Sequence, residues 1–392
     1  MLNFINDLKS KMNFNLNEQQ QLIKKTAREF ANDNLRPSVV ERDEKSLFPK
    51  DEIRQMGELG FMGVMISPDY GGAGLDTISY CLALEEIAKV DASAAVIMSV
   101  NNSLVCNLIY KYGSDEQKNK YLPSLCTGKH LGAFSLSEPQ SGSDASNMLT
   151  YAKKEKSNYF INGTKNWVTN GISSNIIILM CLTKKNVGHK GVSAFIIEKD
   201  FDGISTGKKE DKLGIRGSDT CEIFFNNCKV PGRNLISGEG KGFNIALDIL
   251  NGGRIGIATQ ALGIAQESLD RSMQYSKERK QFGKKIAEFG AIQSKIAKMA
   301  IHIEASRLLI HKAASLKDLG LDFAKEAAMA KHFSSQAAMD CSSQCVQIFG
   351  GYGYMRETGV ERLMRDAKIT QIYEGTSEIQ EMVIAKSLLK GD

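Results

Sequence analysis

One carboxylate near the C-terminus stands in a sequence suited to proton transfer. Glu374 follows Tyr373 and precedes Gly375, and a Ser-x-x-Gln pattern made by Ser377 and Gln380 comes directly after it. This pattern predicts a capping box, in which the two side chains bind free amides at a helix start. The spacing therefore predicts an acid on a tight loop at the mouth of the last helix. Such an acid suits a general base, and an ordinary loop end is the alternative interpretation.

Two further segments contain residues suited to binding a polar or flat ligand. Residues 134–144 combine serines, acids and a glycine around one proline, which fits either a polar-ligand loop or a generic turn. Trp167 is the only tryptophan, and Thr169 lies two residues after it. A lone tryptophan usually belongs to a core. The functional alternative is a flat wall against a flat cofactor, with Thr169 as a hydrogen-bonding neighbour.

A cluster of glycines raises the question of a nucleotide. Gly350, Gly351 and Gly353 follow a predicted helix rather than a strand, and the third glycine of a dinucleotide fingerprint would fall at Arg356. The pattern therefore argues against a Rossmann dehydrogenase. On local evidence, a turn between helices is favoured over a phosphate contact.

Two arginines stand beside breaks in helical periodicity. Arg279 ends a long predicted helix next to Phe282, where it would complement the helix dipole or bind a phosphate or flavin. Gly252 and Gly253 precede Arg254 and each lower helix propensity by about 1 kcal/mol. That cost indicates that something packs closely against the backbone there.

The composition excludes several classes of function. The 392 residues contain 50 basic and 45 acidic side chains, and the formal charge of +5 fits an anionic ligand such as a nucleotide, without a basic block for nucleic acid. The longest apolar run, residues 176–182, is far shorter than the roughly 20 residues of a membrane span. The five histidines and eight cysteines show no metal-ligand spacing. We therefore expect no metal, and free thiols in a reducing compartment.

The periodicity of the chain predicts how these residues are positioned. Helical spacing dominates residues 1–129 and 241–392, whereas residues 130–240 hold short runs rich in Ile, Val and Phe. Asn162-Gly163 predicts a hairpin between two of these strands. We expect an α+β fold that is mostly α, with an N-terminal helical bundle, a central small antiparallel β domain and a C-terminal helical domain.

Taken in order, five of these segments resemble the acyl-CoA dehydrogenase family, in its short-chain or short branched-chain, bacterial-like type. The segments are FSLSEPQSGSD, WVTNG, RKQFG, QIFGGYGY and IYEGTSEIQ, and the resemblance covers essentially the whole chain. It implies the fold of that family, with a C-terminal four-helix bundle. It also implies bound FAD, a fatty acyl-CoA substrate, electron delivery to an electron-transfer flavoprotein, and a homotetramer.

The resemblance also assigns residues to the expected ligands. It places beside the flavin ring Phe134, Leu136, Ser137, Gly142, Ser143, Trp167, Val168 and Thr169. It places beside the diphosphate and adenosine, partly across a subunit boundary, Arg279, Phe282, Gln347, Ile348, Phe349, Gly350, Gly351, Thr376, Ser377 and Glu378. The implied substrate contacts are Ser143, Asn251, Gly252, Gly253, Arg254 and Gly375.

Glu374 matches the catalytic base of the family. It would remove the α-proton of the thioester, while hydrogen bonds from its own backbone amide and from an FAD ribityl hydroxyl stabilise the developing enolate. The β-hydride passes to the flavin, which gives a trans-2-enoyl-CoA. Burial should raise the pKa of Glu374 and the start of the last helix should lower it. We expect desolvation to prevail once substrate excludes water.

Two glycines distinguish this chain within the family. Some branches carry the base at the position that matches Gly253, and because that position is glycine here, Glu374 is the assigned base. Gly290 stands where relatives usually carry a glutamine near FAD, which puts one hydrogen bond to the cofactor in question. The sequence leaves the acyl-chain length open, since the glycines near the substrate are compatible with a butyryl or a methyl-branched group.

Two other functions stay open. An acyl-CoA oxidase would reoxidise the flavin with oxygen, although such relatives are usually much longer. A non-catalytic flavoprotein of the same fold, either DNA-associated or an assembly factor, would tolerate loss of the base that is present here. We expect neither nucleic-acid binding nor a membrane span, and a location in the cytoplasm of a bacterium or the mitochondrial matrix of a eukaryote.

Overall fold

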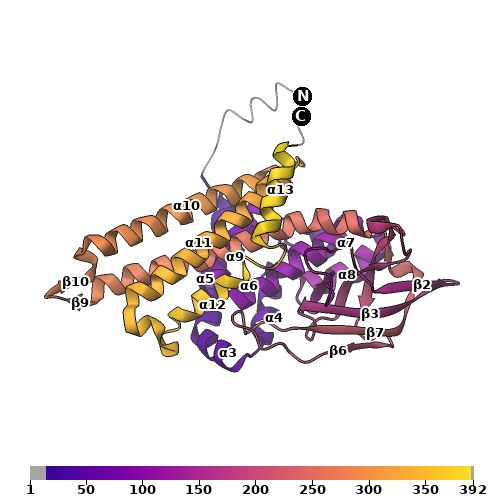
Figure 1. Cartoon of the computed structure of the whole chain (residues 1–392), viewed down its shortest axis with the longest axis horizontal. Coiled ribbons are helices and arrows are strands. Elements are labelled where there is room, and N and C mark those ends of the chain that lie inside the picture. The colour runs from indigo at the N-terminus through magenta and orange to yellow at the C-terminus, as the bar shows by residue number, and fades with distance from the viewer. Residues whose placement is uncertain (1–14, 390–392) are drawn as a thin grey trace, which may run out of the picture.

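The computed structural model describes residues 15–389, with helices toward both ends of the chain and strands between them (Figure 1). The first helix of the described residues, α2 (Glu18–Phe30), begins with a capping box in which the side chains of Asn17 and Gln20 bind each other's backbone amides. The other helices of this region are α3 (Val39–Lys45), α4 (Lys50–Glu58), α5 (Thr77–Val90), α6 (Ala92–Ser99), α7 (Asn107–Tyr112) and α8 (Asp115–Cys126).

A continuous helical run through α6 and α7 forms the centre of the N-terminal core. The π-helical segment Val100–Cys106 joins the two helices. Within the described residues, the run Ala92–Tyr112 is the one helix long and apolar enough to cross a membrane, yet 94% of its apolar window is buried inside the protein. Its apolar surface is thus accounted for by core packing.

The strands in the middle of the chain form one twisted sheet. They are β1 (Gly132–Ser135), β2 (Tyr151–Glu155), β3 (Asn158–Thr169), β4 (Ile176–Leu182), β5 (Val192–Glu198), β6 (Ile204–Thr206), β7 (Thr220–Pro231) and β8 (Leu235–Ile236). The order is β6-β7-β3-β2-β4-β5-β8, with β1 beside β4. Most pairs are antiparallel as expected, but β1 pairs with β4 in parallel, and β2 meets β4 at one parallel pair. In sequence, the hairpin of β2 and β3 lies between β1 and β4. The chain therefore crosses back before β4 begins, and β4 runs in the same direction as β1.

The hairpin predicted at Asn162-Gly163 is wrong. Both residues lie inside the continuous strand β3, at a bulge in its pairing with β7. Gly163 has φ +149°, and an added Cβ would lie 2.5 Å from Oγ1 of Thr150. The glycine therefore permits a close approach between neighbouring segments rather than a turn. The chain reverses instead near Lys156, whose φ is +54°.

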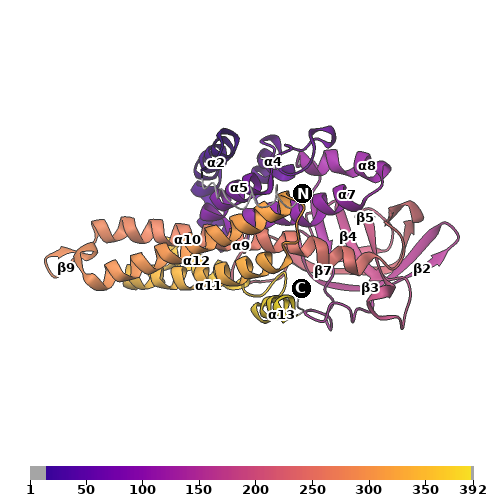
Figure 2. The same ribbon diagram turned by 90° about the horizontal axis from the view of Figure 1, so that it is seen from above.

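The C-terminal region is helical, as expected, and is built around three long helices. They are α9 (Gly242–Glu278), α10 (Gly290–Asp318) and α11 (Ala324–Phe349), and they run side by side (Figures 1 and 2). Two shorter helices, α12 (Val360–Ile369) and α13 (Ser377–Leu389), both pack on α11. A small hairpin of β9 (Lys280–Gln281) and β10 (Lys284–Lys285) joins α9 to α10, with Gly283 at its turn.

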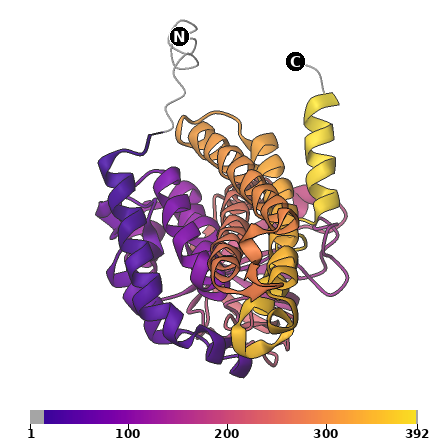
Figure 3. The ribbon, with the colours of Figure 1, turned by 90° about the vertical axis from the view of Figure 1, so that its left-hand side faces the viewer.

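The arrangement of the layers makes α9 the shared element of the molecule. The N-terminal helices lie along one side of the long bundle, and α13 lies on the opposite side (Figure 2). Seen along the long axis, α13 stands apart from the other helices (Figure 3). Helix α9 packs against α5 as well as against α10 and α11. Residues on α9 can therefore face both the N-terminal helices and the loop that precedes α13.

Candidate active site

The loop between α12 and α13 holds Glu374 in a strained backbone conformation. Glu374 has φ +51° and Gly375 has φ +94°, so two consecutive residues are in the left-handed region. The Gln380 side chain donates hydrogen bonds to the carbonyls of Glu374 (3.2 Å) and Gly375 (2.9 Å). Among the described residues, no group accepts a hydrogen bond from the Glu374 amide. The turn thus leaves this N–H available to a ligand.

The capping box predicted at Ser377 is wrong in its details. Ser377 is already the first residue of α13, and Thr376 caps the helix, with its Oγ1 accepting from the Ile379 amide at 3.4 Å. Because the cap lies one residue earlier, the Gln380 side chain is turned back onto the Glu374 loop rather than onto the Ser377 amide. Gln380 therefore shapes the loop that carries the acid.

The carboxyl group of Glu374 lies directly against α9. A Cβ added to Gly253 would stand 2.1 Å from Oε2 of Glu374 and 2.8 Å from a methyl of Leu104. The close packing predicted from the two helix glycines is thus confirmed for Gly253. Any side chain at position 253 would displace the Glu374 carboxyl group, because that group fills the space where the side chain would lie.

Burial dominates the electrostatics of this acid. The Oε2 atom is buried and has no hydrogen-bond partner among the described residues. Desolvation raises the pKa of Glu374 to about 7, and the positive charges of Lys331 and Arg254 oppose this shift. The upward direction of this pKa shift agrees with the expectation from the sequence. The charges that oppose the shift belong to two side chains that pack nearby.

Arg254 contributes a second buried polar group beside the acid. Its Nη1 donates to Oδ1 of Asn251 at 2.6 Å, while its Nε is buried without a partner. Burial lowers the pKa of Arg254, and Glu374 partly offsets this. Unpartnered atoms on both Arg254 and Glu374 indicate a space that a polar ligand completes.

A buried hydrogen-bond chain ties the loop to two helices. The Tyr373 hydroxyl donates to Oε1 of Gln260 on α9, and Nε2 of Gln260 donates to the Ala92 carbonyl of α6 at 2.8 Å. One helical turn before Gln260, Gly256 faces the Tyr80 hydroxyl and Ser99, which bond to each other at 3.0 Å. Residue-type reasoning missed all of these because no local signal links them.

A buried ion pair joins the two segments predicted to face the flavin. Lys165 of β3 donates to Glu138 at 2.9 Å and to the Leu136 carbonyl at 2.8 Å. The next residue, Asn166, donates its amide to the Ser137 carbonyl at 2.9 Å. The structure therefore brings residues 134–143 next to residues 167–169.

Trp167 lies on the surface rather than in the core. Its side chain is 61% exposed, and its backbone has φ +58° at a second bulge of β3. Val168 beside it is buried in the sheet core, and Gly142 and Ser143 are exposed. The exposed indole agrees with the functional alternative, a flat wall for a ligand, and excludes the core interpretation.

The second predicted FAD region forms a separate pocket at the tip of the bundle. Its volume is about 620 Å³, and it is lined by Tyr275, Arg279, Gln281, Ile286, Ile348, Phe349, Gly350, Gly351, Tyr352, Met355 and Glu357. No heavy atom lies within 4 Å of a Cβ added to Gly350 or Gly351, so their backbone is open to a ligand. Phe349 stacks on Tyr275 with ring centroids 4.1 Å apart. Of the other predicted residues here, Phe282 is 94% exposed, and neither it nor Gln347 lines the pocket.

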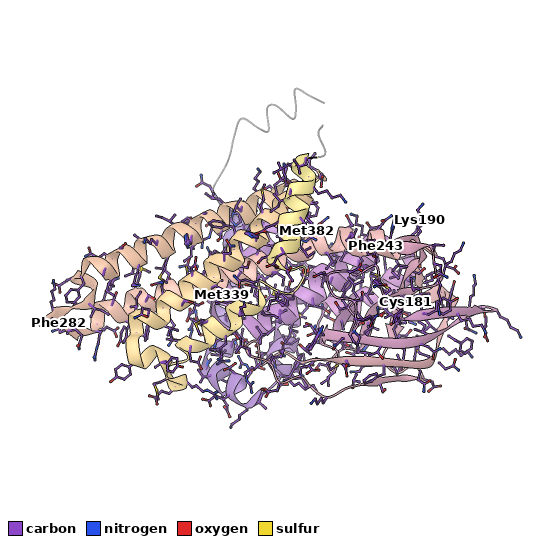
Figure 4. The ribbon with its side chains drawn as sticks, in the orientation of Figure 1. Cys181, Lys190, Phe243, Phe282, Met339 and Met382 are labelled. Atoms are coloured by element: carbon purple, nitrogen blue, oxygen red, sulfur yellow. The ribbon has the colours of Figure 1, made fainter. Side chains whose placement is uncertain are left out.

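The two predicted FAD regions lie apart in one chain, one in and beside β1 and β3 of the sheet and the other at the β9–β10 end of the bundle (Figure 1). Figure 4 labels Phe282 at the far tip of the bundle and Cys181 in the sheet, across the long axis of the molecule. Thr376, Ser377 and Glu378 lie at the start of α13 and do not line that pocket. One subunit therefore does not bring all the predicted cofactor residues together. The space beside Gly290 is open, because no heavy atom lies within 4 Å of an added Cβ.

Comparison with known proteins decides the family. The N-terminal, middle and C-terminal domains of acyl-CoA dehydrogenase match residues 17–129, 133–228 and 240–389. The chain is 47% identical over 379 residues to the short-chain-specific acyl-CoA dehydrogenase of Clostridium acetobutylicum, which covers 97% of this chain and all of that protein. The chain belongs to the acyl-CoA dehydrogenase family.

Solved structures agree with this assignment to the acyl-CoA dehydrogenases. The butyryl-CoA dehydrogenase of Megasphaera elsdenii superposes with a TM-score of 0.95 at 47% identity, covering 96% of this chain and 100% of that one. A chain from a study of the electron transferring flavoprotein of Acidaminococcus fermentans gives a TM-score of 0.96 at 48% identity, covering 97% and 100%.

The acyl-CoA dehydrogenase fold brings in residues that the sequence did not single out. Lys331 is the clearest case, because it is fully buried within the active-site region on α11. Its signal is present in the sequence, since a lysine on the apolar stripe of a helix needs a partner. Glu138 and Lys165 offer no such signal, because their pairing depends on how β3 returns past the loop after β1.

Proposed function

We propose that the protein is an FAD-dependent acyl-CoA dehydrogenase that converts a short-chain acyl-CoA to the trans-2-enoyl-CoA. The observation that carries this proposal is Glu374, a half-buried acid whose pKa is raised to about 7, with a buried, unpartnered Oε2 and a free backbone amide beside it. A carboxylate of this basicity is suited to proton transfer at neutral pH. The named short-chain and butyryl-CoA dehydrogenases support the short acyl group. Whether that group is straight or methyl-branched is left to a panel of acyl-CoA substrates.

The residues present fit FAD. The exposed indole of Trp167 and the open Gly350 and Gly351 backbone beside Arg279 offer a flat wall and a site for a diphosphate. When bound, FAD supplies the acceptor for the β-hydride. We assign the flavin wall to the residues predicted around Phe134 and Trp167, and the adenosine diphosphate to the pocket lined by Arg279.

The chain's own contribution to the reaction is placement and proton transfer. The Glu374 amide donates to the thioester carbonyl, which stabilises the enolate that forms as the α-proton leaves. The Glu374 carboxylate takes that proton. Arg254 and Asn251 form the polar boundary of the substrate site, and the Tyr373–Gln260 bond keeps the loop fixed on α9.

A homotetramer would complete the cofactor sites. Because the flavin wall lies on the sheet and the Arg279 pocket lies at the β9–β10 end of the bundle, we propose that each FAD is held by the flavin wall of one subunit and the Arg279 pocket of another. Trp167→Ala and Arg279→Met subunits should each retain little FAD. Refolded together, they should regain FAD in some of their sites, and a mixture that stays empty would contradict the shared site.

The remaining assignments follow from the family. We propose an electron-transfer flavoprotein as the electron acceptor, in line with the study that contains a closely similar chain. The eight cysteines are all free and buried, which fits a reducing compartment: the cytoplasm of a bacterium or the mitochondrial matrix of a eukaryote.

Anaerobic titration of the FAD-loaded protein with acyl-CoA thioesters tests the function. Butyryl-CoA should bleach the flavin absorbance, and a panel of straight and methyl-branched acyl-CoAs with a dye acceptor should place the optimum at a short chain. Rapid peroxide formation in air without any added acceptor would favour the oxidase instead. No bleaching with any acyl-CoA would favour a non-catalytic flavoprotein.

A further inference from the structure

Lys331 is a fully buried amine in a helix whose buried positions just before it are alanines. It lies on the inward stripe of α11 with Ala327, Ala328 and Ala330 close in sequence, and none of its side chain is exposed. Desolvating an ammonium group is costly, so a buried lysine needs hydrogen bonds and negative charge around it. The neighbours of Lys331 therefore indicate what it does.

The amine of Lys331 holds the loop of the catalytic acid. Its Nζ donates to the Gly375 carbonyl at 2.6 Å, and Nε2 of Gln380 donates to the same oxygen at 2.9 Å. Gly375 follows Glu374 directly, and both have positive φ. Two donors from different helices thus fix one carbonyl in the turn that aims the carboxylate at α9.

The charges around Lys331 centre on the same acid. Glu374 is the leading source of negative charge, Glu378 of α13 adds a second, and Arg254 of α9 opposes them. From the side of the acid, Lys331 is the leading opposing charge, Arg254 is the next, and Tyr80 of α5 and Tyr373 also face it. Lys331 is therefore both a clamp on the loop and a cation beside the carboxylate.

We propose that Lys331 is a positioning residue for Glu374, holding the Gly375 carbonyl and supplying the positive charge that keeps the buried carboxylate ionised. This inference rests on the proposed function of Glu374. Gln380 shares the first task but carries no charge, so the two residues divide the work. Lys331 acts through Glu374 and leaves the substrate contacts to other residues.

The expected consequence is a change in the pH at which the base becomes active. Desolvation lowers the pKa of Lys331 to about 8, so the amine is charged where the pKa of Glu374 lies, about 7. Without the Lys331 charge, Arg254 is the remaining cation that opposes the rise in the Glu374 pKa. The pKa of Glu374 then rises, and a smaller fraction of the acid is ionised at neutral pH.

The test compares Lys331→Met with Gln380→Met in the FAD-loaded protein. Both variants remove one donor from the Gly375 carbonyl, but only Lys331→Met removes a charge. Ser335→Ala, buried one turn along α11, serves as the control for helix packing. Two rates are measured from about pH 5.5 to about pH 9.5, a range that extends roughly two pH units to either side of the pKa of the base. They are kcat with butyryl-CoA, and the exchange of the α-proton into heavy water by enzyme whose flavin has been chemically reduced.

Lys331→Met should move the acidic limb of both pH profiles to higher pH by about one unit, so that both rates fall about tenfold at the low-pH end. Gln380→Met should lower both rates at every pH with the limb in its wild-type place, and Ser335→Ala should match wild type. An unmoved limb in Lys331→Met, or an equal shift in Gln380→Met, would overturn the inference. Failure of wild-type protein to reduce its flavin would instead refute the proposed function.

Discussion

At the scale of single residues, the site depends on an acid that the folded protein makes weaker than a free glutamate. Glu374 lies in contact with α9 with one oxygen desolvated and unpartnered. Its pKa of about 7 allows it to take a proton at neutral pH and to release it afterwards. The same desolvation means that the ionised carboxylate destabilises the folded state. Both the pKa and this loss of stability can be measured.

The pH dependence of Glu374 is the first prediction. Because the deprotonated form is active, kcat should rise as pH increases through about 7. The folded-state pKa lies above the unfolded value, so the acid's contribution to stability is lost as pH rises from about 4.5 to 7, by at most about 3 kcal/mol. Glu374→Gln should lower kcat roughly 10²–10⁴-fold. At pH 8 and equal FAD loading, urea denaturation should show it to be more stable than wild type. Retained turnover would refute the assignment of the base.

A second prediction concerns the space shared by Gly253 and Glu374. In Gly253→Ala the new methyl would stand 2.1 Å from Oε2, so the carboxylate must move and kcat should fall at least about tenfold, since small displacements of a base are costly. Gly252→Ala gains the same helix propensity, but its Cβ meets nothing nearer than 3.9 Å. It should therefore lose much less activity. Equal losses would show that the contact is not decisive.

At the scale of elements, an ion pair keeps two segments of the proposed flavin wall together. Lys165 and Glu138 are both buried, and Glu138 also accepts from the amides of Leu149 and Thr150. The Lys165 charge and these hydrogen bonds outweigh desolvation and lower the pKa of Glu138 to about 2. Its stabilising contribution is therefore present above the unfolded carboxyl pKa and is lost as pH falls toward 2.

The third prediction removes one partner of that pair. Lys165→Met leaves Glu138 buried and unpaired, which should cost roughly 3–5 kcal/mol in urea denaturation and weaken retention of FAD. In the double variant Lys165→Met with Glu138→Gln, no charge is stranded, so part of the stability should return. If the double variant is no more stable than the single one, the two residues are not energetically coupled.

The strand elements also show where sequence patterns mislead. Asn162-Gly163 has the composition of a tight turn, yet it lies within β3 because the glycine lets that strand pass close to Thr150. The Ser377 capping pattern failed for a similar reason. A local pattern records which backbone angles are allowed, whereas neighbouring segments decide which of them is used.

At the scale of the whole molecule, one buried network connects all three regions near the helix that leads to Glu374. Arg365 of α12 binds Asp43 of α3, with Nη1 to Oδ1 at 3.1 Å, and the Leu213 carbonyl at 3.0 Å. The adjacent Asp366 accepts from the amide of Ile215. Helix α12 is therefore fixed to the N-terminal helices and to the β domain at once.

The fourth prediction tests this connection. Arg365→Met strands the Asp43 carboxylate and should lower the unfolding free energy by roughly 2–3 kcal/mol. Arg54→Met is the control, because Arg54 is exposed and has one weak pair with Glu58, 3.6 Å away. It should change stability by less than about 0.5 kcal/mol. Calorimetry of both variants gives the comparison, and equal melting temperatures would refute a structural role for the network.

The sequence by itself determined the fold class, the family and the acid, because these depend on local signals: helical periodicity, short β-branched runs, and motifs whose order is informative. Glu374 could be proposed as the base because it lies in one of the motifs that resemble the family, whereas its local sequence alone also fits an ordinary loop end. Which residues surround that acid was decided only by the tertiary structure. Lys331, Gln260 and Gly253 come from helices distant in sequence, and their roles arise from distances and shared burial. The raised pKa likewise belongs to the packed site, because desolvation exists only once these helices exclude water.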